Sequence, residues 1–154
     1  MIATDHPEDA LVLRRDEAGV ATLTLNRPRQ YNALSQAMLG ALQVDARGLL
    51  ANWMVPGKIV PGMGGAMDLV SGAKKVVVAM IHTARGTPKI VETCDYPLTA
   101  IRPVDLIVTD LAVIAVTPQG LKLQERAPGV TVAEIQAATG TPLIVEGEVP
   151  EMAL

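Results

Sequence analysis

The sequence predicts an α/β fold: an open, mixed or parallel sheet with short flanking helices, preceded by a β-hairpin. Three observations predict it. Hydrophobic residues make up 49% of the 154 residues and charged residues 19%, which is ample material for a buried core. The continuous apolar run over residues 74–81 (KKVVVAMI) is typical of a strand covered on both faces. Short segments with helix signals are interspersed among such runs along the chain.

The first elements are two strands joined by a turn. Residues 11–14 and 20–25 are rich in Val, Leu and Thr, and the second run alternates between apolar and more polar residues. Residues 16–19 separate them, with Gly19 free to take a positive φ. We therefore expect a β-hairpin at this end of the chain.

The next segment, residues 35–42, is compatible with two structures. Leu34, Met38 and Leu42 lie four residues apart, which is a helical spacing that a serine N-cap would support. Residues 38–44 could equally form a short buried strand, because a short apolar run does not distinguish the two structures.

Beyond a loop rich in glycine and proline over residues 53–65, the pattern predicts two helices and several strands. A short helix is expected over residues 66–72. A second is expected over residues 130–140, with a capping box at 131–134 and Gly140 ending the helix in a left-handed conformation. Strands are predicted over residues 74–81, 104–109, 111–116, 121–124 and 143–145.

Charge and composition limit the partners and the location. A net charge of -3 and an aromatic content of 2% provide neither a basic surface nor stacking platforms, so we expect no nucleic-acid partner. The most apolar stretch, residues 104–116, contains two aspartates and is too short to span a bilayer, so we expect no membrane partner. Cys94 is the single cysteine, and the N-terminus lacks the apolar run of a signal peptide. We expect a cytoplasmic location, no internal disulfide and no metal site.

The most distinctive stretch is GKIVPGMGGAMDLV, at residues 57–70. Glycine in such a turn lets the backbone approach a ligand closely, because there is no Cβ in the way. If a helix begins directly afterwards, the backbone N–H groups of Gly65 and Ala66 could hold a carbonyl oxygen, an oxyanion or a phosphate. A tight connection without a ligand is the simpler interpretation of the pattern taken alone. The spacing fits neither a dinucleotide nor a nucleoside-triphosphate motif.

His82, at the end of the apolar run, could be a base or a ligand, but a hydrogen-bonded structural histidine is the interpretation we favour. His6 is the other histidine, and neither has a Ser or Cys partner close in sequence, so a Ser-His-Asp triad cannot be assembled. Trp53 is interpreted as a packing anchor.

Two motifs together resemble the B subunit of 3-oxoacid CoA-transferases, of the succinyl or acetoacetyl type. They are ANWMVPGK at residues 51–58 and GMGGAMDLV at residues 62–70. The similarity runs from about Met38 to Leu154 and corresponds to the C-terminal half of the subunit. The other matching segments are 38–44, 82–84, Cys94, 97–99, 104–105, 107–113 and 129–132. The resemblance implies a truncated transferase-like domain over residues 38–154, whose sheet lacks strands that the complete subunit contains.

The first part of the chain resembles a different family. VATLTLNRP at residues 20–28 and NALS at residues 32–35 look like the opening of an enoyl-CoA hydratase (crotonase-type) protein. That resemblance implies that Ala33 and Leu34 contact CoA through the backbone. Residues 1–37 would then be a crotonase-like segment and not a full domain, since the later oxyanion-hole segment and catalytic acids of that family are absent. The chain therefore resembles a fusion of two CoA-using fragments.

The transferase resemblance also implies a mechanism and a missing group. In that family a glutamate carboxylate attacks the acyl-CoA thioester, and a glutamyl-CoA intermediate passes CoA to a second acid, as in ketone-body metabolism. The glutamate belongs to a Glu-Asn-Gly motif, which occurs nowhere in these 154 residues. What remains is the backbone of Gly64, Gly65 and Ala66, implied to lie near the thioester carbonyl. Two further departures, Leu49 and Ile81, place apolar residues where the family usually has an acid.

The leading hypothesis is a CoA-transferase B subunit that takes a CoA thioester as substrate, holds no permanent cofactor and pairs with an A subunit. Because the nucleophile is missing, no catalytic residue is assigned and no turnover is expected. The alternatives are a crotonase-type hydratase or isomerase fragment, which is supported by the first third of the chain alone, and a non-catalytic CoA-binding or structural domain.

Overall fold

The computed structural model describes residues 12–17, 20–25, 36–57 and 65–152. They belong to two compact units, Met1–Leu34 and Ser35–Leu154. In the first unit, β1 (Val12–Glu17) pairs with β2 (Val20–Leu25) in an antiparallel register that sets Glu17 opposite Val20. The predicted hairpin is present, with a first strand that continues to Glu17. The turn with Gly19 lies outside the described residues.

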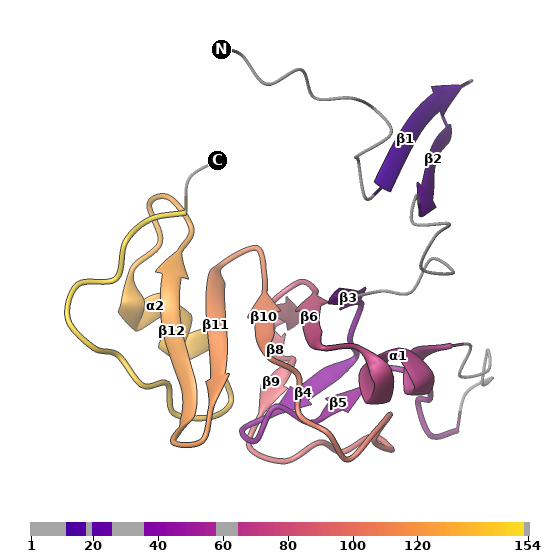
Figure 1. Cartoon of the computed structure of the whole chain (residues 1–154). Helices are drawn as coiled ribbons and strands as arrows, with labels where there is room; N and C mark the ends of the chain where they lie inside the picture. The colour runs from indigo at the N-terminus through magenta and orange to yellow at the C-terminus, as the bar shows by residue number, and fades with distance from the viewer. Residues whose placement is uncertain (1–11, 18–19, 26–35, 58–64, 153–154) are drawn as a thin grey trace, which may run out of the picture. The chain divides into compact units, whose positions relative to one another are not determined.

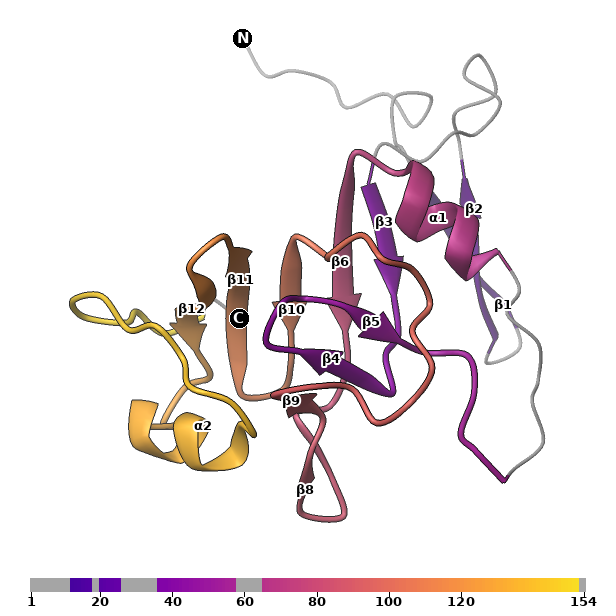
Figure 2. The same ribbon diagram turned by 90° about the horizontal axis from the view of Figure 1, so that it is seen from below.

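A five-stranded sheet forms the centre of the second unit, in the order β12-β11-β10-β6-β3. Figure 2 shows the five strands side by side. β3, β6 and β10 run parallel, whereas β10, β11 and β12 form an antiparallel meander. The strands are β3 (Gln36–Leu39), β6 (Lys75–Ala79), β10 (Leu106–Val108), β11 (Ala112–Thr117) and β12 (Gly120–Arg126). This open, mixed sheet with short helices confirms the predicted fold class.

The middle of the sheet is buried because β6 carries an unbroken run of valines. Val76 and Val78 are fully buried and Val77 is 5% exposed, while the residues at both ends of the strand are exposed. Ile107 on β10 and Ile114 on β11 are fully buried beside them. Each such side chain stabilises the fold by about 1.5–3 kcal/mol relative to exposure. An apolar strand of this kind must be covered on both faces, as its sequence predicted.

Very short strands lie beside this sheet (Figure 1), and the sequence pattern did not reveal them. Strands of two or three residues are too short for a period of two to emerge. They form a three-stranded sheet in the order β5-β4-β9 and a two-stranded sheet β7-β8. Their bounds are β4 (Gln43–Asp45), β5 (Leu50–Ala51), β7 (Thr83–Ala84), β8 (Thr87–Pro88) and β9 (Ile90–Val91).

The described part of the ambiguous segment, residues 36–42, contains a strand over residues 36–39 and no helix, so the helical alternative is wrong. Its residues 36–39 pair in parallel with β6, and tertiary pairing therefore overrides the helical spacing. The single strand expected over residues 38–44 is also replaced by two strands, β3 and β4, which join different sheets.

Two helices are present in the described residues, α1 (Ala66–Gly72) and α2 (Val132–Ala138). α1 has the predicted bounds, and Figure 2 shows it beside β3. α2 has the predicted capping box: the Glu134 backbone N–H donates to the Thr131 hydroxyl at 3.2 Å, and the Thr131 backbone N–H donates to the Glu134 carboxylate at 2.8 Å. Neither helix is long and apolar enough to cross a membrane.

The left-handed conformation expected at Gly140 is wrong. The residue that ends α2 is Thr139, in an extended conformation, and Gly140 has no positive φ. A Cβ on Gly140 would lie 2.9 Å from the backbone oxygen of Ile90, to which the Gly140 N–H donates at 2.8 Å. Glycine is therefore needed here for a close backbone approach and not for its dihedral freedom.

The last predicted strand, over residues 143–145, is reduced to isolated bridges. Ile144 bridges to Lys122, and Glu151 bridges to Arg126, both in parallel with β12. Backbone bonds between Ile144 and Leu121, and between Met152 and Arg126, accompany them. The C-terminal segment thus covers the outer edge of β12, which would otherwise present unpaired backbone groups.

The turn between β4 and β5 gives a test of packing. Gly48 has φ +79°, and a Cβ there would meet Val116 Cγ1 at 2.6 Å and Pro103 Cβ at 3.3 Å. Gly57 has φ +77° but no atom within 4 Å of its Cβ position. We expect Gly48→Ala to lower the free energy of unfolding by about 2–5 kcal/mol, because strain and overpacking add. Gly57→Ala should cost only the strain, about 1–2 kcal/mol. Urea denaturation of the two variants measures the difference, and equal losses would contradict the packing argument.

Candidate functional site

The glycine-rich segment of the sequence ends at Gly65, directly before α1. Gly65 is the N-cap, with φ −83° and ψ 9°, and its carbonyl accepts the Leu69 N–H at 2.9 Å. No described side chain caps this helix, and a Cβ on the exposed Gly65 would meet nothing within 4 Å. The N–H groups of a first helical turn have no partner inside the helix. The Gly65 and Ala66 N–H groups therefore have no acceptor within α1. Gly64 lies outside the described residues.

Arg102 fixes the other end of α1. Its guanidinium donates to the carbonyl oxygens of Val70 at 2.8 Å and of Ala73. It also lies 3.4 Å from the Asp105 carboxylate, which accepts the Val76 N–H at 2.8 Å. A guanidinium at the C-terminal end of a helix satisfies carbonyls that have no partner inside the helix. Arg102 thereby ties α1 to the start of β6 and to the loop before β10.

Arg102 also borders an open cleft of about 690 Å³. The other charged residues that line it are Arg47, Glu92 and Asp105. Arg47 forms an ion pair with Asp45 at 3.0 Å, and the Thr141 hydroxyl donates to the Glu92 carboxylate at 2.5 Å. Both arginines are paired with aspartates, Glu92 is bonded to a neutral hydroxyl, and the four lining charges sum to zero, so the cleft offers an ionic ligand little net attraction.

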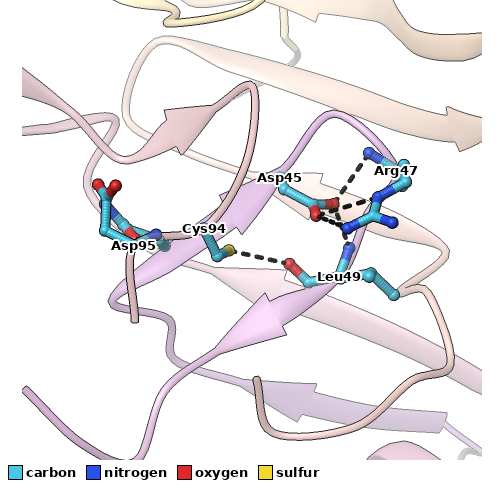
Figure 3. Close-up of polar contacts among 6 residues, drawn as sticks. Asp45, Arg47, Leu49, Cys94 and Asp95 are labelled. Atoms are coloured by element: carbon cyan, nitrogen blue, oxygen red, sulfur yellow. Dashed lines mark hydrogen bonds and ion pairs between the residues drawn. The ribbon is translucent and has the colours of Figure 1, made fainter. Parts of the chain in front are cut away.

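A buried aspartate organises the turn between β4 and β5 (Figure 3). Asp45 is fully buried, and one of its oxygens accepts the backbone N–H groups of Arg47 and Leu49, both at 2.9 Å. The Arg47 guanidinium donates to the other oxygen at 3.0 Å. A buried carboxylate with four donors is a structural charge, because its acceptor sites are occupied.

Cys94 lies beside this turn, where its thiol donates to the Leu49 carbonyl at 3.5 Å (Figure 3). Burial raises the pKa of the Cys94 thiol to about 12, and the nearby carboxylates of Asp45 and Asp95 contribute to that shift. The thiolate is the nucleophilic form of cysteine. Cys94 is therefore unsuited to replace a missing nucleophile.

His82 is fully buried, and both of its ring nitrogens have a hydroxyl partner. Nδ1 lies 2.9 Å from Thr109 Oγ1, and Nε2 lies 2.9 Å from Thr139 Oγ1. Burial lowers the pKa of His82, against the opposing effect of Asp110. The structure supports the structural interpretation, because an enclosed imidazole cannot reach an external substrate.

The structure places the predicted site residues unevenly. Gly65 and Ala66 lie together at the start of α1, whereas Ala33 and Leu34 lie outside the described residues. Of the two positions where the family usually has an acid, Leu49 is buried and Ile81 is 57% exposed.

Within the described part of the chain, no three or more His, Cys, Asp or Glu side chains are gathered in a way that could hold a metal ion. Every buried side-chain nitrogen or oxygen there also has a hydrogen-bond partner. The sequence had not pointed to Arg102 or Asp45, and local pattern could not have done so, since their partners are remote backbone groups or turn amides.

The chain matches the family described as Coenzyme A transferase over residues 23–138. The matched region begins within the segment that resembles crotonase-type proteins, and that second resemblance stays a prediction. Over 116 residues the chain is 52% identical to the beta chain of the acetate CoA-transferase of Haemophilus influenzae, in an alignment that covers 75% of this chain and 52% of that protein.

Two further likenesses agree. Over 106 residues the chain is 58% identical to the mitochondrial succinyl-CoA:3-ketoacid coenzyme A transferase 2A of Rattus norvegicus, covering 67% of this chain and 20% of that one. An acyl-CoA transferase structure from Escherichia coli O157:H7 superposes with a TM-score of 0.67 at 24% identity, over 78% of this chain and 28% of that one, which shows a shared fold. The chain spans about half the length of the Haemophilus beta chain that it matches.

The raised pKa of Cys94 predicts an unreactive thiol. At pH 8 we expect iodoacetamide to modify the folded chain at least about a hundredfold more slowly than the chain in denaturing urea, because the thiolate fraction is small at a pKa of about 12. The denatured chain is the matched control, since Cys94 is the single cysteine. Mass spectrometry of timed aliquots measures both rates, and similar rates would contradict the burial argument.

Proposed function

The chain belongs to the coenzyme A transferase family, and we propose that it supplies the CoA-binding backbone of a B subunit without supplying the nucleophile. The proposal rests on two observations taken together: the backbone donors are present, and the motif that carries the nucleophile is absent from the sequence. The family match includes the Gly65–Ala66 turn at the start of α1, while the sequence contains no Glu-Asn-Gly motif.

The backbone of this turn is suited to a thioester carbonyl or to the oxyanion that forms when it is attacked. Backbone donors fixed before the reaction stabilise developing negative charge without reorganising. Arg102 holds α1 from its far end, so the donors keep a fixed position relative to β6. In this proposal the Gly65 and Ala66 N–H groups bind and orient a CoA thioester as substrate.

Three buried or half-buried groups, Cys94, His82 and Asp45, are unsuited to replace the glutamate. A substitute nucleophile would have to be accessible and deprotonated, as covalent catalysis requires. Cys94 has a raised pKa, His82 is enclosed, and the buried carboxylate of Asp45 is fully engaged by donors. The chain is therefore proposed to bind CoA and to leave the acyl group untransferred.

The proposed partner is an A subunit, because several of the matched relatives are named as the beta or B subunits of transferases. The proposed substrate class is a CoA thioester exchanging with a 3-oxoacid, as the name of the rat relative indicates for that protein. The second candidate is a non-catalytic CoA-binding domain. Backbone donors without the nucleophile support it as strongly as they support the B-subunit proposal.

Backbone donation at α1 can be tested with proline, which removes one N–H and is tolerated at the first helical position. Ala66→Pro is expected to weaken acetyl-CoA binding about tenfold, the value of roughly one hydrogen bond to an ionised or carbonyl acceptor. Val132→Pro at the first position of α2 is the matched control and should leave the affinity unchanged. Isothermal titration with acetyl-CoA, whose thioester carbonyl is the proposed acceptor, measures both affinities. If both variants lost the same affinity, the binding site could not be assigned to α1.

Transfer activity gives a separate test. The chain mixed with a matching A subunit should form no acetoacetyl-CoA from succinyl-CoA and acetoacetate, because no glutamate is present to form the covalent intermediate. A complete B subunit with the same partner serves as the positive control. Robust turnover by the mixture with this chain would refute the proposal, whereas crotonyl-CoA hydration would favour the crotonase-type alternative.

A further inference from the structure

The imidazole of His82 connects three parts of the second unit. His82 follows β6 and precedes β7, Thr109 follows β10, and Thr139 ends α2. The ring lies between the two threonine hydroxyls at 2.9 Å from each. It is therefore the polar link between the central sheet and the C-terminal end of α2.

The hydrogen bonds of Thr109 decide which state of the ring fits. Its hydroxyl oxygen accepts the backbone N–H of Leu111 at 3.1 Å and that of Ala112 at 2.9 Å. A hydroxyl oxygen has two acceptor positions, and both are thus occupied. The hydroxyl proton can go to the Ala112 carbonyl at 3.1 Å, which already accepts the Thr109 N–H, or to His82 Nδ1 at 2.9 Å. Every group is best satisfied when Thr109 donates to Nδ1.

Thr139 has the complementary role. Its hydroxyl donates to the Ile135 carbonyl at 2.7 Å, in the last turn of α2. Its oxygen can then accept a proton from His82 Nε2. These two threonines together select the neutral imidazole that carries its proton on Nε2, and they leave no acceptor for a second proton on Nδ1.

We propose that His82 is a pH-sensitive latch: the neutral Nε2–H tautomer holds the C-terminal end of α2 against the sheet, and protonation of Nδ1 releases it. The added proton would face Thr109 Oγ1, whose acceptor positions are filled, so an N–H and an O–H would be directed at one another. An unsatisfied buried donor destabilises the closed arrangement. Gly140 directly follows Thr139, the C-cap of α2, and its N–H donates to the Ile90 carbonyl at 2.8 Å.

Charged groups near the ring affect how readily His82 is protonated, but they do not take part in its two hydrogen bonds to threonine. The Asp110 carboxylate accepts the His82 backbone N–H at 2.6 Å and favours the protonated ring. The Lys89 backbone N–H donates to the His82 carbonyl, and burial lowers the pKa of the Lys89 ammonium group. On α2, the Glu134 carboxylate is bonded to Thr131 at the opposite end of the helix.

The direction of the pH effect follows from burial. Burial lowers the pKa of His82 below its ordinary value near 6.5, so the unfolded or opened chain binds the proton more readily than the closed one. The latch is therefore fully effective above the ordinary pKa and weakens as the pH falls below it.

The first measurement uses the unmodified chain. A long-range ¹⁵N–¹H spectrum of the histidines at pH 7.5 should show His82 with an unprotonated Nδ1 and a protonated Nε2. Either the Nδ1–H tautomer or a doubly protonated ring at this pH overturns the assignment. This measurement needs no variant, so it stays decisive if a substitution prevents folding.

The second measurement follows the opening itself. Amide protection factors, corrected for intrinsic exchange, should fall about tenfold for Ile135 and Gly140 between pH 7.5 and 5.5, while Val78 in β6 stays protected. The His82→Gln variant should lose this pH dependence. His6→Gln is the matched control, since His6 is the other histidine of the chain, and it should retain the response. Protection at Ile135 and Gly140 that does not change with pH, or a response lost in His6→Gln, would refute the latch.

Discussion

Burial of β6 between two parallel neighbours is the constraint on which the second unit depends. Val76, Val77 and Val78 require cover on both faces, and β3 and β10 supply the backbone partners on either side. Parallel strands cannot be joined by a tight turn, so the chain must cross over between β3 and β6. That crossover contains β4, β5 and α1. The glycine turn that begins α1 is thus positioned by the requirement to return to a buried parallel strand.

Hydrogen bonds and ion pairs of polar side chains hold the helices and short strands to the central sheet. Asp45 closes the turn between β4 and β5, and Arg102 joins the end of α1 to Asp105 and so to the start of β6. His82 joins the sheet to α2. Asp45 and His82 are fully buried, so removing a partner from either costs more than the bond itself, because the remaining polar group is left buried and unsatisfied. These titratable side chains are therefore committed to structure, and in the proposed function the contacts with the ligand are made by the backbone of Gly65 and Ala66.

The chain matches about half of a transferase beta chain, which suggests why backbone donors are present without a nucleophilic side chain. A catalytic site assembled from several parts can lose the part that carries the nucleophile and still retain the scaffold that binds. In the described residues the sheet is open, its β12 edge is covered by the C-terminal segment, and α1 is held at its far end. In the proposed function, binding and turnover are therefore separable, since fixed donors stabilise charge independently of the group that attacks.

The sequence by itself determined the apolar strands, both helices and the α2 capping box, because continuous valine runs and local capping residues act over a few positions. It also determined the family through the motifs ANWMVPGK and GMGGAMDLV, and the missing Glu-Asn-Gly could be recognised directly. Only the tertiary structure decided that residues 36–39 are a strand, because the helical spacing there yields to pairing with β6. It likewise decided that Gly140 serves a close contact with Ile90, and that His82 meets two distant threonines. The physical reason is the same in each case: the deciding partner lies far along the chain, and only folding brings it into contact.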